Sequence, residues 1–155
     1  MITPDDFLAA MVAAVKAAFP GETIYTNVKP RDGDRPCNLV ELQRIRLGEI
    51  SGGTVKLLYT YMITDLVTVD ARHMSNIEVL DVRTLALVGL FAKGYLKVGD
   101  RAPHVESCTT AHNLDYTETT VVLSLNYDRA EFDPAAMAPL MEELNLRTNL
   151  EEEIL

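Results

Sequence analysis

Apolar residues recur at helical spacing near the start of the chain, between a capping sequence and a Pro-Gly pair. Thr3 suits the N-cap, Pro4 the first helical position, and Asp6 the positive end of the helix dipole. The Pro-Gly pair at residues 20 and 21 ends the run. The apolar residues that share the helical spacing are Phe7, Leu8, Met11, Val12, Val15 and Phe19. The pattern therefore predicts an amphipathic helix over residues 4–19.

Two later stretches are typical of strands: the first has an apolar start and a charged continuation, and the second alternates between apolar and polar residues. In residues 35–50 the apolar positions are Leu39, Leu42, Ile45 and Leu47. In residues 55–65 they are Val55, Leu57, Tyr59, Tyr61 and Ile63, with Lys56, Thr60 and Thr64 on the other face. Ser51, Gly52 and Gly53 between the two stretches are typical of a turn. The sequence predicts a long β-hairpin.

The distal part of this hairpin is rich in charge of both signs. Its arms carry Glu41, Arg44, Arg46 and Glu49 on one side and Lys56 on the other. If the hairpin projects beyond the core, opposite charges can align one subunit with the next, and like charges reject wrong neighbours. The alternative is a solvated surface, where an exposed ion pair contributes roughly 0 to 1 kcal/mol. We take these five residues as a candidate subunit interface.

The remaining patterns predict further helices and strands. Ser75 and Glu78 resemble a capping box that opens a helix ending near residues 93 and 94. A brief strand around Ile24 comes before the hairpin, and two short strands flank the turn at Gly99 and Asp100. The second helix carries Ile77, Leu80, Leu85, Val88 and Phe91, and a long strand over residues 117–127 carries Val121, Leu123, Leu125 and Tyr127.

The C-terminal region predicts a short helix followed by an acidic end. Asp133 can cap Pro134, and the apolar positions of this helix are Met137, Leu140, Met141 and Leu144. We therefore divide the chain into an α+β domain over residues 1–132 and a C-terminal helix with an acidic tail over residues 133–155.

The order of these elements predicts an α+β fold. We expect a largely antiparallel sheet with a long β-hairpin, helices packed on one face, and a short C-terminal helix. The expected core consists of Phe7, Met11, Val15, Leu39, Leu57, Tyr59, Leu80, Leu85, Val88, Val121, Leu123 and Leu125.

Composition narrows the classes of function. The chain has 155 residues, 48% of them hydrophobic and 24% charged, which fits one globular domain. A formal net charge of −9 argues against a surface that grips nucleic acid, because binding phosphates requires clustered Lys and Arg. Cys37 and Cys108 lack the spacing of a zinc knuckle or a disulfide framework. The first apolar stretch follows two aspartates and is short, so we expect neither a signal peptide nor a membrane span.

The sequence predicts no catalytic residue, cofactor site or metal site. The glycines at residues 51–53 and 98–100 lack the spacing of phosphate-binding loops and fit turns better. One alternative stays open: His104, Cys108 and His112 lie four residues apart and can serve as metal ligands or as a thiolate–imidazole pair if the segment curls. The carboxylates at 5 and 6 and at 151–153 are typical of a helix start and a solvated run.

Three segments of the chain resemble the small tail terminator proteins of tailed bacteriophages and related prophage tail-like particles. They are "FLAAMVAAVKAAFPGETIYTNV", "RPCNLVEL" and "GYLKVGDRAPHVESCTTAHNLDYTETTVVLSLNYD". The resemblance covers about residues 2 to 128. The chain departs from the family at Asn38, where an aromatic residue is common, and over residues 65–76.

The resemblance implies a structural virion protein without enzymatic activity. Such a protein caps the finished tail tube as a ring, with a homohexamer expected, and ends tube polymerisation. Its partners are other copies of itself, the tail tube protein and the head–tail connector protein, and DNA passes through the channel without specific binding. No membrane partner is expected. Two alternatives remain: another head–tail joining protein, or a small metal-binding or enzymatic domain that uses His104, Cys108 and His112.

Overall fold

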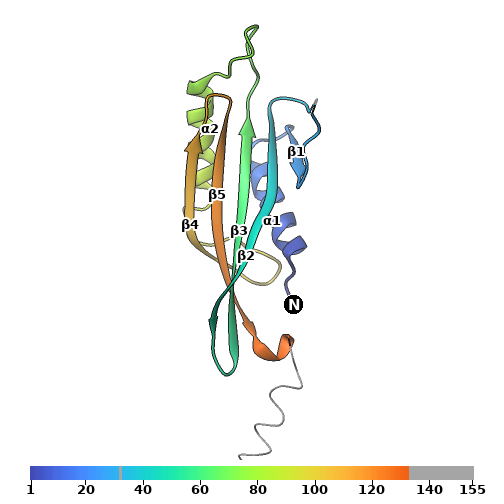
Figure 1. The fold of residues 1–155 in the computed structure, drawn as a ribbon, viewed down its shortest axis with the longest axis vertical. Helices are drawn as coiled ribbons and strands as arrows, with labels where there is room; N and C mark the ends of the chain where they lie inside the picture. Colours follow the sequence, from blue (N-terminus) through green and yellow to red (C-terminus); the bar gives the residue numbers. More distant parts are fainter. Residues whose placement is uncertain (32, 133–155) are drawn as a thin grey trace, which may run out of the picture.

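The computed structural model describes residues 1–31 and 33–132 and confirms the α+β class, with two helices and a five-stranded mixed sheet (Figure 1). The expected C-terminal helix and the boundary of the C-terminal region fall outside the described residues. The elements are α1 (Pro4–Ala18), β1 (Thr23–Thr26), β2 (Cys37–Ile50), β3 (Thr54–Leu66), α2 (Ile77–Gly89), β4 (His104–His112), β5 (Tyr116–Asp128) and a short 3₁₀ helix, η1 (Arg129–Glu131).

The strands lie in the order β1-β2-β3-β5-β4. The short β1 runs parallel to β2, and all other neighbours are antiparallel, which makes the sheet mixed. β2 and β3 pair from Cys37 opposite Leu66 to Ile50 opposite Val55. The turn between them is closed by a hydrogen bond from the Ser51 amide to the Thr54 carbonyl at 2.8 Å. In Figure 1 the distal end of this strand pair extends beyond the helices.

α1 begins as its sequence predicts. Thr3 and Asp6 form a reciprocal capping box, with the Thr3 hydroxyl accepting from the Asp6 amide and the Asp6 carboxylate accepting from the Thr3 amide. The ring of Phe7 stacks on that of Tyr59 in β3, with centroids 4.3 Å apart. The Tyr61 hydroxyl donates to the Pro4 carbonyl at 2.9 Å. The helix is therefore fixed to the centre of the sheet by both apolar and polar contacts.

α2 begins one residue later than its sequence predicts. The N-cap is Asn76, whose side-chain oxygen accepts from the Val79 amide at 3.3 Å, and Ser75 does not cap the helix. The Ser75 hydroxyl instead donates to the Asp115 carbonyl at 2.8 Å. Ser75 thus ties the helix start to the β4–β5 turn, a long-range partner that a local capping pattern does not reveal.

A cluster of charged residues holds α2 against the sheet. Arg83 donates to both oxygens of the fully buried Asp65 on β3 and to both oxygens of Glu22 before β1. Its guanidinium also lies 4.0 Å from the ring centroid of Phe19. Burial raises the pKa of Asp65, and the hydrogen bonds from Arg83 counteract part of that rise. A shift of α2 would separate Arg83 from Asp65 and leave a buried charge unpaired, which is strongly destabilising. The cluster therefore determines the position of α2 on the sheet.

Most of the expected core is confirmed. The buried members are Phe7, Met11, Val15, Tyr59, Leu80, Val121, Leu123 and Leu125, while Leu57 and Val88 are half-buried. The assignment of Leu85 to the core is wrong, because this side chain is 74% exposed. The buried residues of α2 are Leu80 and Leu87. The assignment of Leu39 to the core is also wrong. Its neighbour Val40 occupies the core position, and Leu39 points to the opposite face of the sheet.

The segment before β4 is less regular than predicted. Instead of two short strands around Gly99 and Asp100, residues 95–104 contain only isolated bridges, Val98 with Arg101 and Tyr95 with His104. Gly99 has a φ of +60°, which explains a glycine in this turn. β4 then continues to His112 as the edge strand next to β5.

Candidate functional site

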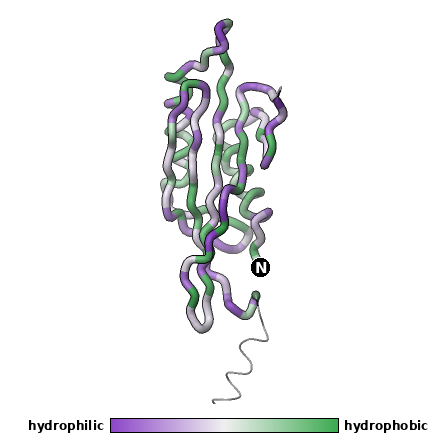
Figure 2. Tube along the Cα trace, viewed as in Figure 1, coloured by the Kyte–Doolittle hydropathy of each residue, from purple (hydrophilic) through white to green (hydrophobic). Residues whose placement is uncertain are grey.

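The distal half of the β2–β3 hairpin exposes apolar side chains on the face that is buried elsewhere. Ile45, Leu47 and Ile50 are 46%, 54% and 59% exposed. Their partners in β3 are Tyr59, Leu57 and Val55, which lie on the helix-facing side of that strand. The hydropathy colouring in Figure 2 shows hydrophobic residues on both arms of this projection. We call Ile45, Leu47 and Ile50 the hairpin strip.

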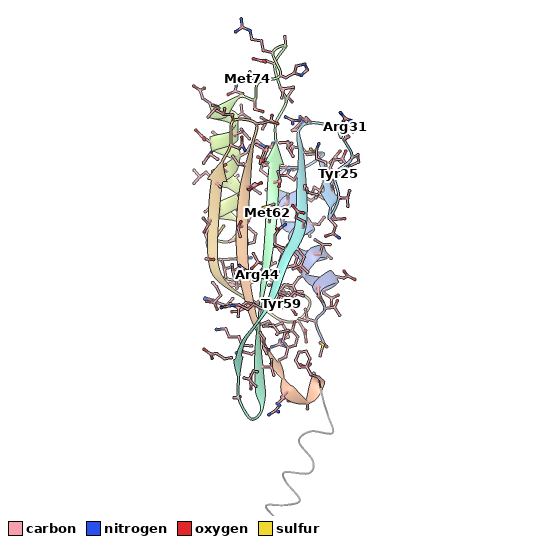
Figure 3. The ribbon with its side chains drawn as sticks, viewed as in Figure 1. Tyr25, Arg31, Arg44, Tyr59, Met62 and Met74 are labelled. Carbon is pink, nitrogen blue, oxygen red and sulfur yellow. The ribbon has the colours of Figure 1, made fainter. Side chains whose placement is uncertain are left out.

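The charged residues predicted as an interface also lie on this hairpin. Arg44 is opposite Thr60 and Arg46 is opposite Leu58, so both side chains point to the sheet face away from the helices. Figure 3 shows Arg44 close to the point where the hairpin leaves the body of the sheet. Both arginines are exposed, and neither forms an ion pair within residues 1–31 and 33–132.

The other three predicted residues are not brought into one cluster. Lys56 lies on the same face as Arg46, but its amine is 3.5 Å from the carboxylate of Glu106 in β4, beyond β5 in the strand order. Glu41 is half-buried and Glu49 is exposed near the turn. A hydrogen bond from Ser124 holds the pKa of Glu106 below its usual range, so this carboxylate is charged at neutral pH. The structure therefore leaves the arginines of the hairpin free for another partner.

One whole face of the sheet is uncovered by the described helices (Figure 1). On β3 this open face carries Lys56, Leu58, Thr60, Met62 and Thr64, which alternate with the buried positions. Most of these side chains are half-buried among their neighbours rather than fully exposed. This broad surface of threonine and apolar side chains is more typical of an extended contact surface than of a compact binding pocket.

The sheet also has two free edges. β1 pairs only with residues 37–40 of β2, so residues 41–50 have no second neighbour within the described chain. β4 pairs with β5, and its start is also bridged to Tyr95 at His104, so that residues 106–112 have no second neighbour within the described chain. A strand at an edge presents unpaired backbone donors and acceptors that can pair with another chain. β2 and β4 lie on either side of the central strands in the strand order, and in Figure 1 the distal part of β2 crosses β3.

A groove of about 500 Å³ lies between α2 and β4, beside one of these free edges. It is lined by Asp81, Thr84, Leu85, Val88, Cys108, Thr110 and His112. Cys108 is half-buried and packs against the hydrophobic core. Burial raises the pKa of its thiol, so the neutral thiol is its form at physiological pH.

The three residues of the alternative metal or thiolate site do not converge. A register shift in β4 pairs His104 with Ser124 but Cys108 with the buried Val121, so His104 and Cys108 point to opposite faces. Cys108 and His112 share a face, yet four residues of strand separate their Cα atoms by about 13 Å. His112 instead lies 3.5 Å from Asp81. Within the part of the chain that the structure describes, no three His, Cys, Asp or Glu side chains form a metal-binding group.

Neither of the two described helices is long and apolar enough to cross a membrane. Comparison with models of known protein families gives no match, and neither does comparison with curated proteins. The candidate function therefore depends on the residues and geometry of this chain.

The sequence had pointed to the charges of the hairpin but not to its apolar strip. The signal was present, because the apolar alternation continues through Ile45, Leu47 and Ile50 in a stretch that is otherwise charged. The groove beside β4 was not predictable, since it depends on how α2 lies over an edge strand.

Proposed function

We propose that this chain is a structural virion protein of the tail terminator type. Copies of it form a ring, with a hexamer expected, that caps the tail tube at its head-proximal end and stops polymerisation. The ring then offers its other face to the head–tail connector protein. In this role the protein acts without an active site, and its working surfaces are those that meet other subunits.

The observation that supports this proposal most directly is the uncovered hairpin strip. Three large apolar side chains about half exposed on a projecting hairpin are unfavourable for an isolated monomer, because contiguous apolar surface in water costs free energy. Beside them, Arg44 and Arg46 have no ion-pair partner in the described chain. A subunit contact would satisfy both features.

The sheet supports a ring for a separate reason. A row of subunits related by rotation can place the free edge of one sheet next to the free edge of the following one, which extends the sheet and removes the edges. The open face, with its threonines and half-buried apolar residues, would then face one side of the ring as a wall. The net charge of −9 would disfavour tight binding of the DNA that passes through the ring.

Charge reversal at the hairpin tests this function. The variant Arg44→Glu with Arg46→Glu keeps the buried side of β2 intact, and circular dichroism verifies that it folds. We expect it to lose ring formation in negative-stain images and to give tails of uncontrolled length. The matched control is Arg31→Glu with Arg72→Glu, which changes the net charge equally at exposed positions outside the hairpin.

The outcomes separate the proposal from its alternatives. Normal rings and normal tail lengths with the folded hairpin variant would contradict a role of these arginines in assembly. Localisation of the protein to the neck, with tail length unaffected by its deletion, would instead favour another head–tail joining protein. Stoichiometric zinc binding that Cys108→Ala with His112→Ala abolishes would favour the metal-binding alternative.

A further inference from the structure

We infer that the groove between α2 and β4 is the docking site for the hairpin strip of a second copy of this chain. In this contact Ile45 and Leu47 of one copy enter the groove of the next, and β2 of the first extends the sheet at β4 of the second. The inference rests on the ring of the proposed function and names the two surfaces that meet in it.

The groove has an apolar lining that the described residues leave uncovered. Leu85 is 74% exposed and Val88 and Cys108 are half-buried along it, and Val82 on the same helix is 72% exposed. Residues 106–112 of β4, beside the groove, have no second strand neighbour in the described structure, whereas His104 and Val105 contact residues 94 and 95. An occupant must therefore cover the apolar lining and pair with the free backbone groups of β4. An added β-strand with apolar side chains on one face does both.

The distal part of β2 has these properties. Residues 41–50 form an extended edge, and the apolar side chains of the hairpin strip point to the helix side of the sheet. Cys108 points to that same side, since it is paired with the buried Val121. When β2 of one copy pairs with β4 of another in one continuous sheet, Ile45 and Leu47 consequently lie on the groove side.

The strand directions of the sheet agree with this pairing. Three successive antiparallel pairings separate β2 from β4, so the two edge strands run in opposite directions. Rotation about the axis of a ring parallel to the strands preserves these directions. β2 of the next copy therefore arrives antiparallel to β4, as the rest of the sheet continues.

The register indicates which residues of the strip reach the groove. Through Tyr61 and Val121, Leu42 lies at the same level of the sheet as Cys108. Closing a sheet into a barrel-like ring requires the strands to tilt by about 35–45° and the register to stagger from one subunit to the next. A stagger toward the hairpin turn brings first Ile45 and then Leu47 opposite Cys108.

Charge complementarity favours the same neighbour. Arg44 and Arg46 lie on the open face at the β2 edge, whereas Glu118 lies on the open face of β5, one strand from the β4 edge. None of these three residues forms an ion pair in the described part of the chain. Adding β2 of one copy to β4 of the next brings the two arginines toward the unpaired carboxylate.

The native Cys108 allows a direct test by disulfide trapping of the full chain. Ile45→Cys and Leu47→Cys are oxidised separately, and the products are separated on non-reducing gels. Because docked thiols are held at a high effective concentration, we expect at least one variant to form dimers and longer covalent ladders about tenfold faster than a control. The control is Val28→Cys, which is 75% exposed and lies outside both surfaces. Cys37 is fully buried in the structure, so we expect it not to cross-link.

Each outcome decides the inference. Cross-links that vanish when Cys108→Ala is added support docking of the strip in the groove. Cross-links that persist with Cys108→Ala would show a hairpin-to-hairpin contact and overturn it. Rates equal to that of the Val28→Cys control would also overturn it. Electron micrographs of the same samples separate the groove contact from the proposed function. Rings without excess cross-linking would contradict the groove contact only. The absence of both rings and cross-links would contradict the groove contact and the proposed function.

Discussion

In the half of the β2–β3 hairpin nearest the helices, Val40, Tyr61 and Ile63 are fully buried, whereas in the distal half Ile45, Leu47 and Ile50 remain about half exposed. Both sets lie on the same face of the same pair of strands. The proximal set is covered by α1, whose Phe7 ring stacks on that of Tyr61 with centroids 6.2 Å apart. The distal set lies toward the end of the hairpin that extends past α1 in Figure 1.

The difference shows that alternation determines which face of a strand is apolar but not what covers that face. In the proximal half the cover belongs to the same chain, and burial there contributes to the stability of the monomer. In the distal half Tyr59 and Val55 of β3 are still buried, whereas their β2 partners Ile45 and Ile50 stay about half exposed among the described residues. We interpret the distal half as a surface for a second molecule, and the predictions below compare the two halves.

The largest expected effect is on the proximal half. Truncation of the buried Phe7 to Ala removes its stacking on Tyr59 and leaves a cavity, which should lower the free energy of unfolding by about 3–5 kcal/mol. Ile50→Ala in the distal half should change it by only about 0.5 kcal/mol, because Ile50 is largely exposed. Urea unfolding followed by circular dichroism measures both. Equal losses in the two variants would remove the distinction between the halves.

Leu123 and Leu85 provide the same contrast outside the hairpin. Leu123 is fully buried on β5, so Leu123→Ala should cost about 2–5 kcal/mol. Leu85 of α2 is exposed, so Leu85→Ala should lower the free energy of unfolding of the monomer by about 0.5 kcal/mol or less. Thermal unfolding of the two variants at the same low protein concentration gives the comparison. An unchanged melting temperature for Leu123→Ala would show that the assignment of the sheet faces is wrong.

Much of the fold was predictable from local patterns. The Thr3 capping box, the turn at residues 51–53 and the buried faces of β3 and β5 follow from short-range chemistry, and the structure contains them. Leu85 was misplaced because α2 is apolar on several sides, so the spacing of its residues did not indicate which side meets the sheet. The Arg83 cluster was missed because it joins Glu22 and Asp65, which are far apart in the sequence.

The candidate site was predictable only in part. Mixed charge on the hairpin is visible in the sequence, and Arg44 and Arg46 lie on the open face without an ion pair among the residues that the structure describes. Lys56, however, pairs with Glu106 because strand order brings β4 close to β3 across β5. A register shift in β4 contributes to keeping His104, Cys108 and His112 apart. The sequence contains no pattern that predicts this shift.

The smallest expected effect concerns the ion pair at the proximal end of β2. Arg35 donates to both carboxylate oxygens of Asp115, and these hydrogen bonds hold the pKa of Asp115 below its usual range. The stabilisation is therefore complete above about pH 4, the ordinary pKa of an aspartate, and is lost as the pH falls through the lower folded-state pKa. Because Asp115 is partly exposed, the gain is roughly 0 to 1 kcal/mol at neutral pH.

Asp115→Asn tests this pair. The difference in free energy of unfolding between the wild-type protein and the variant should be constant above about pH 4 and should shrink at lower pH. Urea titrations across the acid range measure it, with the exposed Asp100→Asn as the matched control. A difference that grows as the pH falls would contradict the direction of the pKa shift.

The central claim is that the hairpin strip serves assembly and not the monomer's own core. The most direct measurement is electron microscopy of tails assembled with the double variant Ile45→Ser and Leu47→Ser, after urea unfolding has shown a free energy within about 1 kcal/mol of the wild-type value. The account predicts tails of uncontrolled length without a terminal ring. Tails of normal length that carry a ring of this folded variant would contradict it.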